Sequence, residues 1–268
     1  GIAVLTVSSL VIKAALAMQL KEMLGLERIE QRDRELIGRA LARFQGHPNI
    51  EVLGNPNPER RLAICSFNVR AGDAYLHPRF VVRLLNDLFG IQSRAGCSCA
   101  GPYGHRLLGI DRQTSHLYKE KILHGDVGLK PGWCRVGFHY LLTDEEFDFI
   151  CQAVEFVADH GLLFLPLYRF DLHTGAWVHR DGDPACGQGD LRGCIEAEMD
   201  GQRASAPADR VSSAEAHRTY LEAAQVMGRD LRQSFRPERL KSTEKDLIAP
   251  DVPDGAVPRR KASPAPCL

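Results

Sequence analysis

The sequence has no excess of charge of either sign. Its 268 residues carry 34 Lys and Arg against 34 Asp and Glu, so the formal net charge at pH 7 is zero. A protein that binds nucleic acid or an anionic membrane through its overall charge needs a surplus of Lys and Arg. The short basic run at residues 259–261 is too small to supply that surplus. Neither nucleic acid nor a membrane is therefore expected as a partner.

Two further features are missing, and each excludes a class of protein. The N-terminal apolar stretch is interrupted by Lys13, too early for a membrane span. It also has no basic region before it and no initiating Met, so it is expected to be an internal segment of a longer protein and not a signal peptide. No Gly-rich phosphate loop of either common type is present, which argues against a nucleotide site.

The eight cysteines are not spaced like a disulfide framework. A chain of this length does not need disulfides to stabilise its core. The simpler interpretation is a reducing environment, and we expect the protein to be cytoplasmic.

Apolar periodicity predicts the secondary structure. Helices are expected over 10–44 with a break at Gly25, 77–89, part of 105–123, 143–160 and 213–234. Strands are expected over 62–69, 91–95 and 133–140, with a hairpin formed by 167–171 and 176–178. Thr143 and Glu146 have the spacing of a capping box.

This order of elements predicts a small α+β domain. Residues 45–160 alternate strand and helix with few strands, which favours helices laid on one face of a sheet. After residue 180 the composition shifts to Gly, Ala, Asp, Arg and Pro, and the segment beyond residue 250 is expected to be disordered.

The turn at residues 94–102 carries the strongest chemical signal. It contains two thiols, Cys97 and Cys99, between glycines that let the backbone approach a ligand. Arg94 supplies a positive charge that favours a thiolate, which is the nucleophilic form of cysteine. The pattern indicates a reactive loop.

Four segments, taken in order, resemble the C-terminal part of the class V aminotransferase family. They are residues 64–67, 84–91, 94–102 and 134–140. The family contains fold-type I, pyridoxal-phosphate-dependent enzymes such as cysteine desulfurases and selenocysteine lyases. The resemblance implies a small C-terminal domain with a short, mostly antiparallel sheet, a long N-terminal linking helix, pyridoxal phosphate as cofactor, an amino-acid substrate and a homodimer.

The resemblance also implies roles for individual residues. Cys99 matches the family's persulfide-forming nucleophile, which takes sulfur from cysteine and leaves alanine, with a sulfur-acceptor protein as a possible partner. Arg135 matches the Arg that binds the substrate α-carboxylate, and Arg94 is a second candidate for substrate binding. Where many desulfurases have a His pair before the nucleophile, this chain has Cys97 and Ser98.

The Schiff-base Lys and the other main cofactor-binding residues of the family have no counterpart here. Lys13, Lys21 and Lys130 lie in contexts that do not match, so the cofactor-binding residues stay unknown. The chain is expected to be a fragment of an enzyme and to be inactive on its own, because the Schiff-base Lys is absent. On this basis residues 1–44 are linking helices, 45–180 form the small domain, and 181–268 are an extension with one helix.

Several alternatives stay open. The parent enzyme could be an aminotransferase or another amino-acid lyase in which Cys99 is only structural. The chain alone could be a non-catalytic binding or dimerisation module. Arg135 could belong to a surface ion pair, and a zinc site built on Cys97 and Cys99 with Cys134, His105 or His139 is disfavoured because structural zinc sites usually show two pairs of ligands. No metal is therefore expected.

Overall fold

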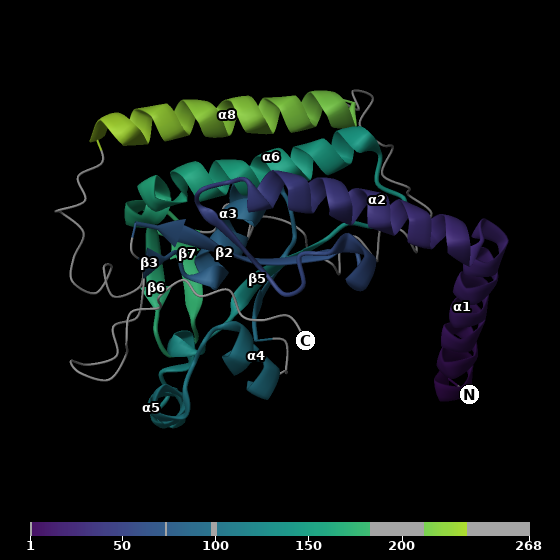
Figure 1. Cartoon of the computed structure of the whole chain (residues 1–268), viewed down its shortest axis with the longest axis horizontal. Helices are drawn as coiled ribbons and strands as arrows, with labels where there is room; N and C mark the ends of the chain where they lie inside the picture. Colours follow the sequence, from purple (N-terminus) through teal and green to yellow (C-terminus); the bar gives the residue numbers. More distant parts are fainter. Residues whose placement is uncertain (1, 73, 98–100, 183–211, 235–268) are drawn as a thin grey trace.

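A small antiparallel sheet lies at the centre of the fold. The computed structural model describes residues 2–72, 74–97, 101–182 and 212–234 (Figure 1). Four strands are ordered β1-β2-β5-β4, and β3 extends the sheet beside the end of β2. Their bounds are β1 Ile50–Leu53, β2 Ile64–Ala71, β3 Ala74–Tyr75, β4 Arg94–Gly96 and β5 Trp133–Gly137. A separate hairpin is formed by β6 (Tyr168–Asp171) and β7 (Ala176–His179).

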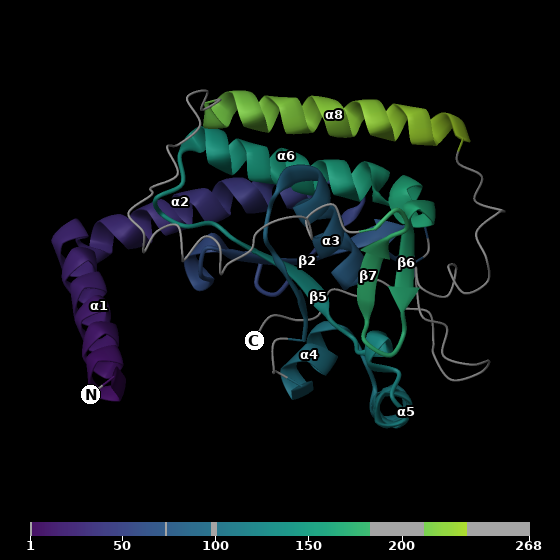
Figure 2. The same cartoon turned by 180° about the vertical axis from the view of Figure 1, so that it is seen from behind.

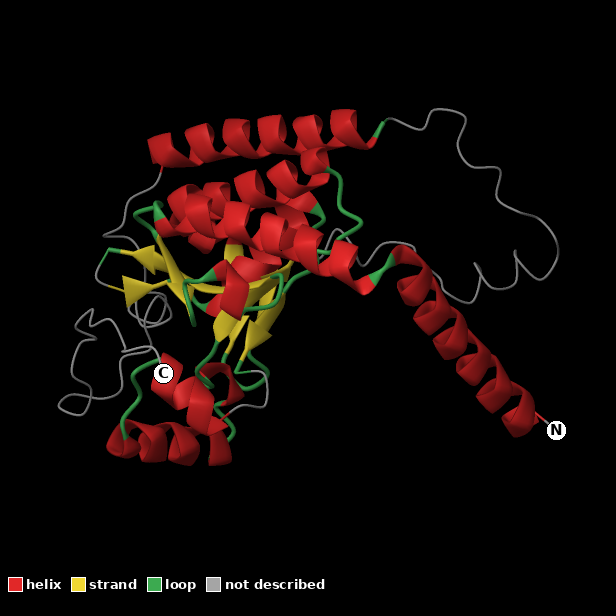
Figure 3. Cartoon of the chain, turned by 45° about the vertical axis from the view of Figure 1, so that its right-hand side comes forward, coloured by secondary structure: helices red, strands yellow, loops and turns green. Residues whose placement is uncertain are grey.

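Helices cover one face of this sheet. They are α2 (Leu26–Gln45), α3 (Pro78–Phe89) and α6 (Asp144–His160), and α8 (Ser213–Ser234) lies over α6 (Figures 1 and 2). The largest fully buried side chains include six phenylalanines: Phe44, Phe67, Phe80, Phe138, Phe147 and Phe164. The expected α+β fold with a small antiparallel sheet is confirmed. Helices α2, α3 and α6 lie on one face, whereas α4 (Gly101–Leu107) lies on the other side of the sheet, where its Gly104 packs against Trp133 (Figure 3).

The alternation of β2 shows which side of the sheet faces the helices. Cys65, Phe67 and Val69 are fully buried in the core. Side chains of a strand alternate between faces, so Ser66 lies on the opposite side. We call that side of the sheet the open face. On strands β2, β5 and β4, the residues of the open face are Ile64, Ser66, Asn68, Arg94, Gly96, Trp133, Arg135 and Gly137.

The helix α6 is the central helix of the layer. Together with the 3-10 segment that follows it, over Asp144–Leu167, it has the length and hydropathy of a membrane span, but half of its apolar 18-residue window is buried inside the protein. Its first turn carries three acidic residues and the expected capping box between Thr143 and Glu146. These are features of a core helix of a globular fold.

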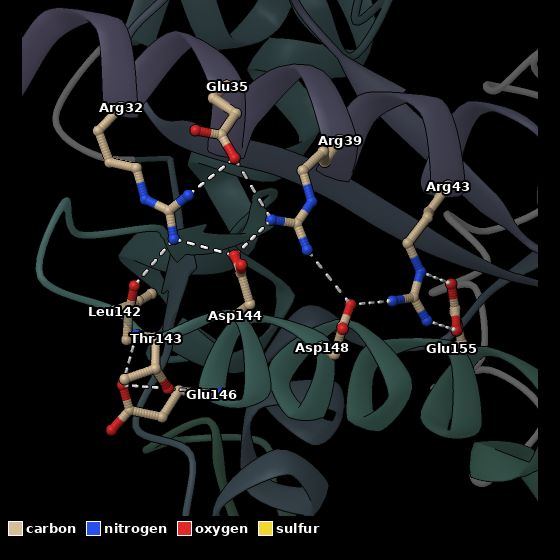
Figure 4. Close-up of polar contacts among 10 residues, drawn as sticks. All are labelled: Arg32, Glu35, Arg39, Arg43, Leu142, Thr143, Asp144, Glu146, Asp148 and Glu155. Atoms are coloured by element: carbon tan, nitrogen blue, oxygen red, sulfur yellow. Dashed lines mark hydrogen bonds and ion pairs between the residues drawn. The ribbon is translucent and has the colours of Figure 1, made fainter.

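An ion-pair network fixes α2 against α6 (Figure 4). Arg32 and Arg39 share Asp144, Arg39 and Arg43 share Asp148, and Arg43 also binds Glu155. The Arg43–Glu155 pair is bidentate, with distances of 2.8 and 2.7 Å. Hydrogen bonds from the Arg39 and Arg32 guanidinium groups hold the pKa of Asp144 below its ordinary value. The planar guanidinium suits such shared contacts, so the network defines how the two helices lie side by side.

The first helix, α1 (Ile2–Leu24), projects away from the rest of the protein (Figures 1 and 2). Gly25, with a φ of 85°, separates it from α2 as expected. Large apolar side chains on its second half are exposed: Val11, Ile12, Leu16, Met18, Leu20 and Met23. Exposed apolar surface of this kind promotes association with another surface.

Some predicted strand boundaries were wrong. The strand expected over 91–95 begins only at Arg94, because Gly90 closes α3 in a left-handed conformation and the Ile91 N–H bonds to the Leu85 carbonyl. The strand expected over 133–140 ends at Gly137. Strands β1 and β3 were not predicted. The segment 105–123 contains α5 (Arg112–Leu123) and the end of α4 (Gly101–Leu107).

The predicted hairpin and C-terminal helix are confirmed, as β6–β7 and α8. The tail beyond residue 250 lies outside the described residues. The division of the chain into linking helices, small domain and extension stays a prediction.

The buried side chain of His77 joins three parts of the fold. It lies before the first residue of α3, its Nε2 is 3.0 Å from the Gly128 carbonyl oxygen, and its Nδ1 accepts from the Arg79 N–H and from Trp177 Nε1 at 3.2 and 3.3 Å. These bonds fit the neutral ring with its proton on Nε2. Burial lowers the pKa of His77 to about 4.

We expect His77 to make the fold acid-sensitive. The unfolded chain binds a proton at His77 below pH about 6.5, whereas the folded chain does so only near pH 4, so stability falls as the pH drops through this window. The free energy of unfolding should decrease by about 1.4 kcal/mol per pH unit, about 3 kcal/mol in all. Urea denaturation between pH 7 and pH 4 measures this. His77→Asn keeps a capping side chain and should show a weaker pH dependence; an unchanged dependence would contradict the assignment.

Candidate functional site

The reactive loop follows the edge strand β4. The chain leaves α3 at Gly90, forms β4 over Arg94–Gly96 and continues to Cys97. It is described again from Gly101, the first residue of α4. The predicted nucleophile Cys99 lies outside the described residues. The site is therefore built from β4, β5 and the start of the loop.

The two predicted substrate-binding arginines are direct neighbours across the sheet. In the pairing of β4 with β5, Arg94 lies opposite Arg135, Ala95 opposite Cys134 and Gly96 opposite Trp133. On the other side of β5, Arg135 lies opposite Ser66 of β2. Residues directly opposite each other project from the same face of a sheet. Arg94, Arg135 and Ser66 thus form one row across three strands.

This row lies on the open face. Cys134, the residue before Arg135, is fully buried on the helix side, and its Sγ is 3.4 Å from the Pro78 carbonyl oxygen. Because successive side chains alternate, Arg135 projects away from the helices. Arg135 is half-buried on an inner strand and Arg94 is exposed on the edge strand. The two guanidinium groups therefore reach solvent on the side of the sheet that α2, α3 and α6 leave uncovered.

Two glycines leave space beside the arginines. A Cβ added to Gly137 or to Gly96 would meet no atom within 4 Å. Gly137 follows Arg135 by two residues on β5, and Gly96 follows Arg94 by two residues on β4, so both lie on the open face. The surface on the Gly137 side of the row is consequently open to a small molecule.

On the other side of the row, next to Gly96, the backbone is tightly packed. A Cβ on Gly132 would lie only 2.6 Å from the Cα of Gly96, so the backbones of the two segments touch. A Cβ on Gly104 of α4 would lie 3.2 Å from the Trp133 ring and 3.8 Å from the Cβ of Cys97. These contacts hold the start of the reactive loop against the beginning of β5 and against α4.

The charge of the row is not balanced within the described part of the chain. There, neither Arg94 nor Arg135 forms an ion pair, so the surface ion pair considered for Arg135 is not found. Glu51, an acidic residue on this face, lies on the far edge strand and pairs with Arg70 at 3.9 Å. Two adjacent guanidinium groups without acidic partners make a site suited to carboxylates.

Three of the other cysteines are poor nucleophiles. Cys65, Cys134 and Cys151 are buried. Burial raises the pKa of Cys65 to about 11, that of Cys151 to about 12, and that of Cys134 further. Such thiols stay protonated at neutral pH. Cys97 is half-buried, and Cys186, Cys194 and Cys267 lie outside the described residues.

Within the described ranges, no group of three or more His, Cys, Asp or Glu side chains could hold a metal ion. His139 is exposed and its ring stacks on that of Tyr140, with 4.2 Å between centroids. His105 is half-buried on α4. In the described part of the chain, neither histidine forms a hydrogen bond or ion pair with a residue of the arginine row.

The described residues do not fit a complete site for pyridoxal phosphate. The lysines among them, Lys13, Lys21, Lys119, Lys121 and Lys130, are all exposed, and none lies on the strands that form the open face. A Schiff-base lysine usually needs a desolvated pocket. A groove of about 450 Å³ runs between α6 and α8, lined in part by Phe156, Leu221 and Gly228, but it lies on the outer side of the helix layer. The open face thus carries two arginines but no lysine within the described residues.

Sequence reasoning missed two contributors to this surface, Ser66 and Gly137. Ser66 belongs to the site only through the register of β2 with β5, which places it opposite Arg135. Gly137 lies two residues after Arg135 on the same strand, and the space beside it depends on the assembled sheet. The alternation of β2 and a strand near β5 were both predicted from the sequence, but the pairing of the two strands and its register were not.

Comparison with known proteins identifies the family. The model of the family "Aminotransferase class-V" matches residues 6–150, which is more than half of the chain. The chain therefore belongs to the class V aminotransferase family. Members of this family depend on pyridoxal phosphate, so that cofactor is the one that membership implies. The matched region contains the arginine row and the reactive loop.

Individual relatives cover smaller regions. A molybdenum cofactor sulfurase from Caenorhabditis briggsae is 27% identical over 150 residues, which is 49% of this chain and 21% of that protein. A cysteine desulfurase from Cronobacter sakazakii is 32% identical over 92 residues, 34% of this chain and 21% of that protein. The chain thus spans about a fifth of the length of these curated relatives.

A solved structure is also similar, the apo structure of a cysteine desulfurase from Thermococcus onnurineus NA1. The sequence identity is 26%, and the match covers 52% of this chain and 28% of that one. The TM-score is 0.39.

Proposed function

We propose that this chain forms the substrate-binding side of a pyridoxal-phosphate-dependent enzyme that acts on an amino acid, with cysteine desulfuration as the leading activity. Family membership supports the enzyme class, and similarity to a cysteine desulfurase and a molybdenum cofactor sulfurase supports sulfur chemistry. The observation that carries the proposal is the arginine row on the open face, which has no acidic partner within the described residues.

Arg135 is the residue proposed to bind the substrate α-carboxylate. A guanidinium donates two parallel hydrogen bonds to a carboxylate, which fixes both the position and the orientation of an amino acid. Arg135 stands on an inner strand that is paired on both sides, by β2 and β4. A side chain held by such a strand is better placed for this task than one on a loop.

Cys99 is proposed as the nucleophile that accepts sulfur. Its thiolate attacks the sulfur of bound cysteine, so that an S–S bond forms and the C–S bond of the substrate breaks. The electron pair of that bond stays on carbon, which takes a proton, and the products are alanine and a Cys99 persulfide. Arg94, five residues earlier, adds positive charge near the loop and favours the thiolate.

A homodimer, a sulfur-acceptor protein as partner, and a cytoplasmic location belong to the same proposal. Family resemblance supports the dimer, and the exposed apolar side chains of α1 provide a surface that another polypeptide could bury.

Two other functions remain candidates. An aminotransferase or other lyase of the same family is favoured by Cys97 and Ser98, which replace the His pair of many desulfurases. A non-catalytic binding or dimerisation module is favoured by the exposed lysines, none of which has a buried setting in the described part of the chain.

Replacing Cys99 with Ala separates these functions. In the parent enzyme that contains this chain, supplied with pyridoxal phosphate and cysteine, we expect a persulfide on Cys99, detected by alkylation and peptide mass spectrometry. Cys99→Ala should abolish the persulfide and lower alanine production at least about 100-fold, because the nucleophile is gone. Cys97→Ala is the matched control and should retain most activity. Normal turnover by Cys99→Ala would favour an aminotransferase, and no alanine from either protein would favour a non-catalytic module.

A further inference from the structure

We propose that the groove between α6 and α8 binds a small organic anion, with its acidic group on Arg229 and Arg232 and its apolar body against Phe156. Carboxylate and phosphate groups share the oxyanion chemistry that a guanidinium recognises. The groove lies between the two outermost helices, away from the open face, so this site does not depend on the activity proposed above (Figures 1 and 2).

The groove has the size of a small-molecule site. Its volume is about 450 Å³, and ligand pockets in proteins usually measure roughly 300–1,000 Å³. Part of its wall is the ring of Phe156 on α6. A Cβ on Gly228 would lie 3.4 Å from Cζ of that ring, so the glycine lets α8 come close to it. Leu221, two turns earlier on α8, adds a second apolar group. The groove can therefore cover the apolar part of a ligand.

The two acidic side chains that line the groove are already paired with other parts of the fold. Both carboxylate oxygens of Glu155 accept hydrogen bonds from Arg43 of α2, at 2.8 and 2.7 Å. Oδ1 of Asp159 accepts a hydrogen bond from Nδ2 of Asn49 at 3.2 Å and lies 3.4 Å from Nε2 of His47. Groups of α2 and of the turn that follows it therefore offset the negative charge of the groove.

The two arginines of the groove have no acidic partner among the described residues. Arg229 and Arg232 are three positions apart on α8, so they are neighbours on the surface of that helix. Nη2 of Arg232 donates to Nδ1 of His160 at 3.0 Å. Burial and the charge of Arg232 lower the pKa of His160, so this ring is neutral at pH 7. The bond holds the Arg232 guanidinium at the groove without cancelling its charge, and an oxyanion can supply the missing negative charge.

The experiment compares benzoate and phenyl phosphate with neutral benzamide, which is close to benzoate in size. Amide chemical shifts of α6 and α8 in the full chain, at neutral pH and low salt, give the dissociation constants. We expect saturable shifts, with both anions binding at least about fivefold more tightly than benzamide. Inorganic phosphate should bind at least about fivefold more weakly than phenyl phosphate, because it has no apolar body to bury. The tighter of the two aromatic anions shows whether the site favours phosphate or carboxylate.

Three variants locate the site. Arg232→Gln and Arg229→Gln should each weaken both anions about fivefold or more and leave benzamide within about twofold, which shows that the groove is intact. Gly228→Leu places a side chain in the groove and should weaken every probe. The matched control is Arg218→Gln, which removes an exposed arginine of the same helix that pairs with Glu222 at 3.8 Å and does not line the groove. It should leave every dissociation constant unchanged.

Several results would overturn the inference. One is equal affinity for benzoate and benzamide, and another is the absence of a saturable shift in α6 and α8 with any probe up to about 50 mM. Anion binding that neither Arg229→Gln nor Arg232→Gln weakens would also contradict it. Phenyl phosphate that binds no more tightly than inorganic phosphate would show simple ion binding, without the apolar contact that the inference requires.

Discussion

Replacing Arg135 with Gln is expected to lower kcat/KM of the native protein for its amino-acid substrate by about 100- to 1,000-fold. Truncating one member of a charge-assisted, bidentate pair typically costs about 3–4 kcal/mol, which corresponds to this change in rate. Gln keeps a hydrogen-bonding amide but loses the charge and the planar fork. Steady-state kinetics over a range of substrate concentrations measures the effect.

The conservative variant makes the test specific. Arg135→Lys keeps the charge but cannot form two parallel bonds, so we expect a smaller loss of about 10-fold. Arg169→Gln, on the hairpin, should leave kcat/KM unchanged. If Arg135→Gln stays within about threefold of the unmodified protein, Arg135 does not bind the substrate.

Replacing Gly132 with Ala is expected to destabilise the fold by about 2–3 kcal/mol. The new Cβ would lie 2.6 Å from the Cα and 2.7 Å from the carbonyl carbon of Gly96, and neither backbone atom can rotate away as a flexible side chain can. The edge strand β4 would have to move off β5, and Arg94 would leave its place opposite Arg135. Urea denaturation measures the loss as a lower midpoint at an unchanged slope.

Gly137→Ala is the matched control for this prediction. Gly137 is the last residue of β5, whereas Gly132 directly precedes its first residue, and the methyl group added at Gly137 would contact nothing within 4 Å. We expect a change of less than about 0.5 kcal/mol. Equal effects of the two substitutions would mean that the approach of Gly132 to Gly96 does not hold β4 in place.

The elements that sequence predicts well are those with local signals. The helix α6 has a capping box at Thr143 and a long apolar periodicity, and α3 ends at a glycine in the left-handed conformation. Strand β1 escaped prediction because its four residues include the charged Glu51 and gain their stability from pairing with β2. Short strands owe their formation to neighbours that are distant in sequence, so local pattern does not reveal them.

The geometry of the candidate site likewise depends on contacts between residues that are distant in the sequence. The residue types of the reactive loop, together with the family resemblance, were enough to select Arg94 and Arg135 as candidates. Their position opposite each other depends on the order β2-β5-β4 and on a register set by long-range contacts. The space beside Gly137 likewise appears only once the strands are assembled.

The claim on which the account depends is that the open face of the sheet meets the substrate. A crystal structure of the native protein with a bound substrate analogue tests it most directly. We predict the analogue's carboxylate in a bidentate contact with the Arg135 guanidinium, with N–O distances of about 2.7–2.9 Å. A carboxylate bound elsewhere, with Arg135 in contact only with solvent, would contradict the account.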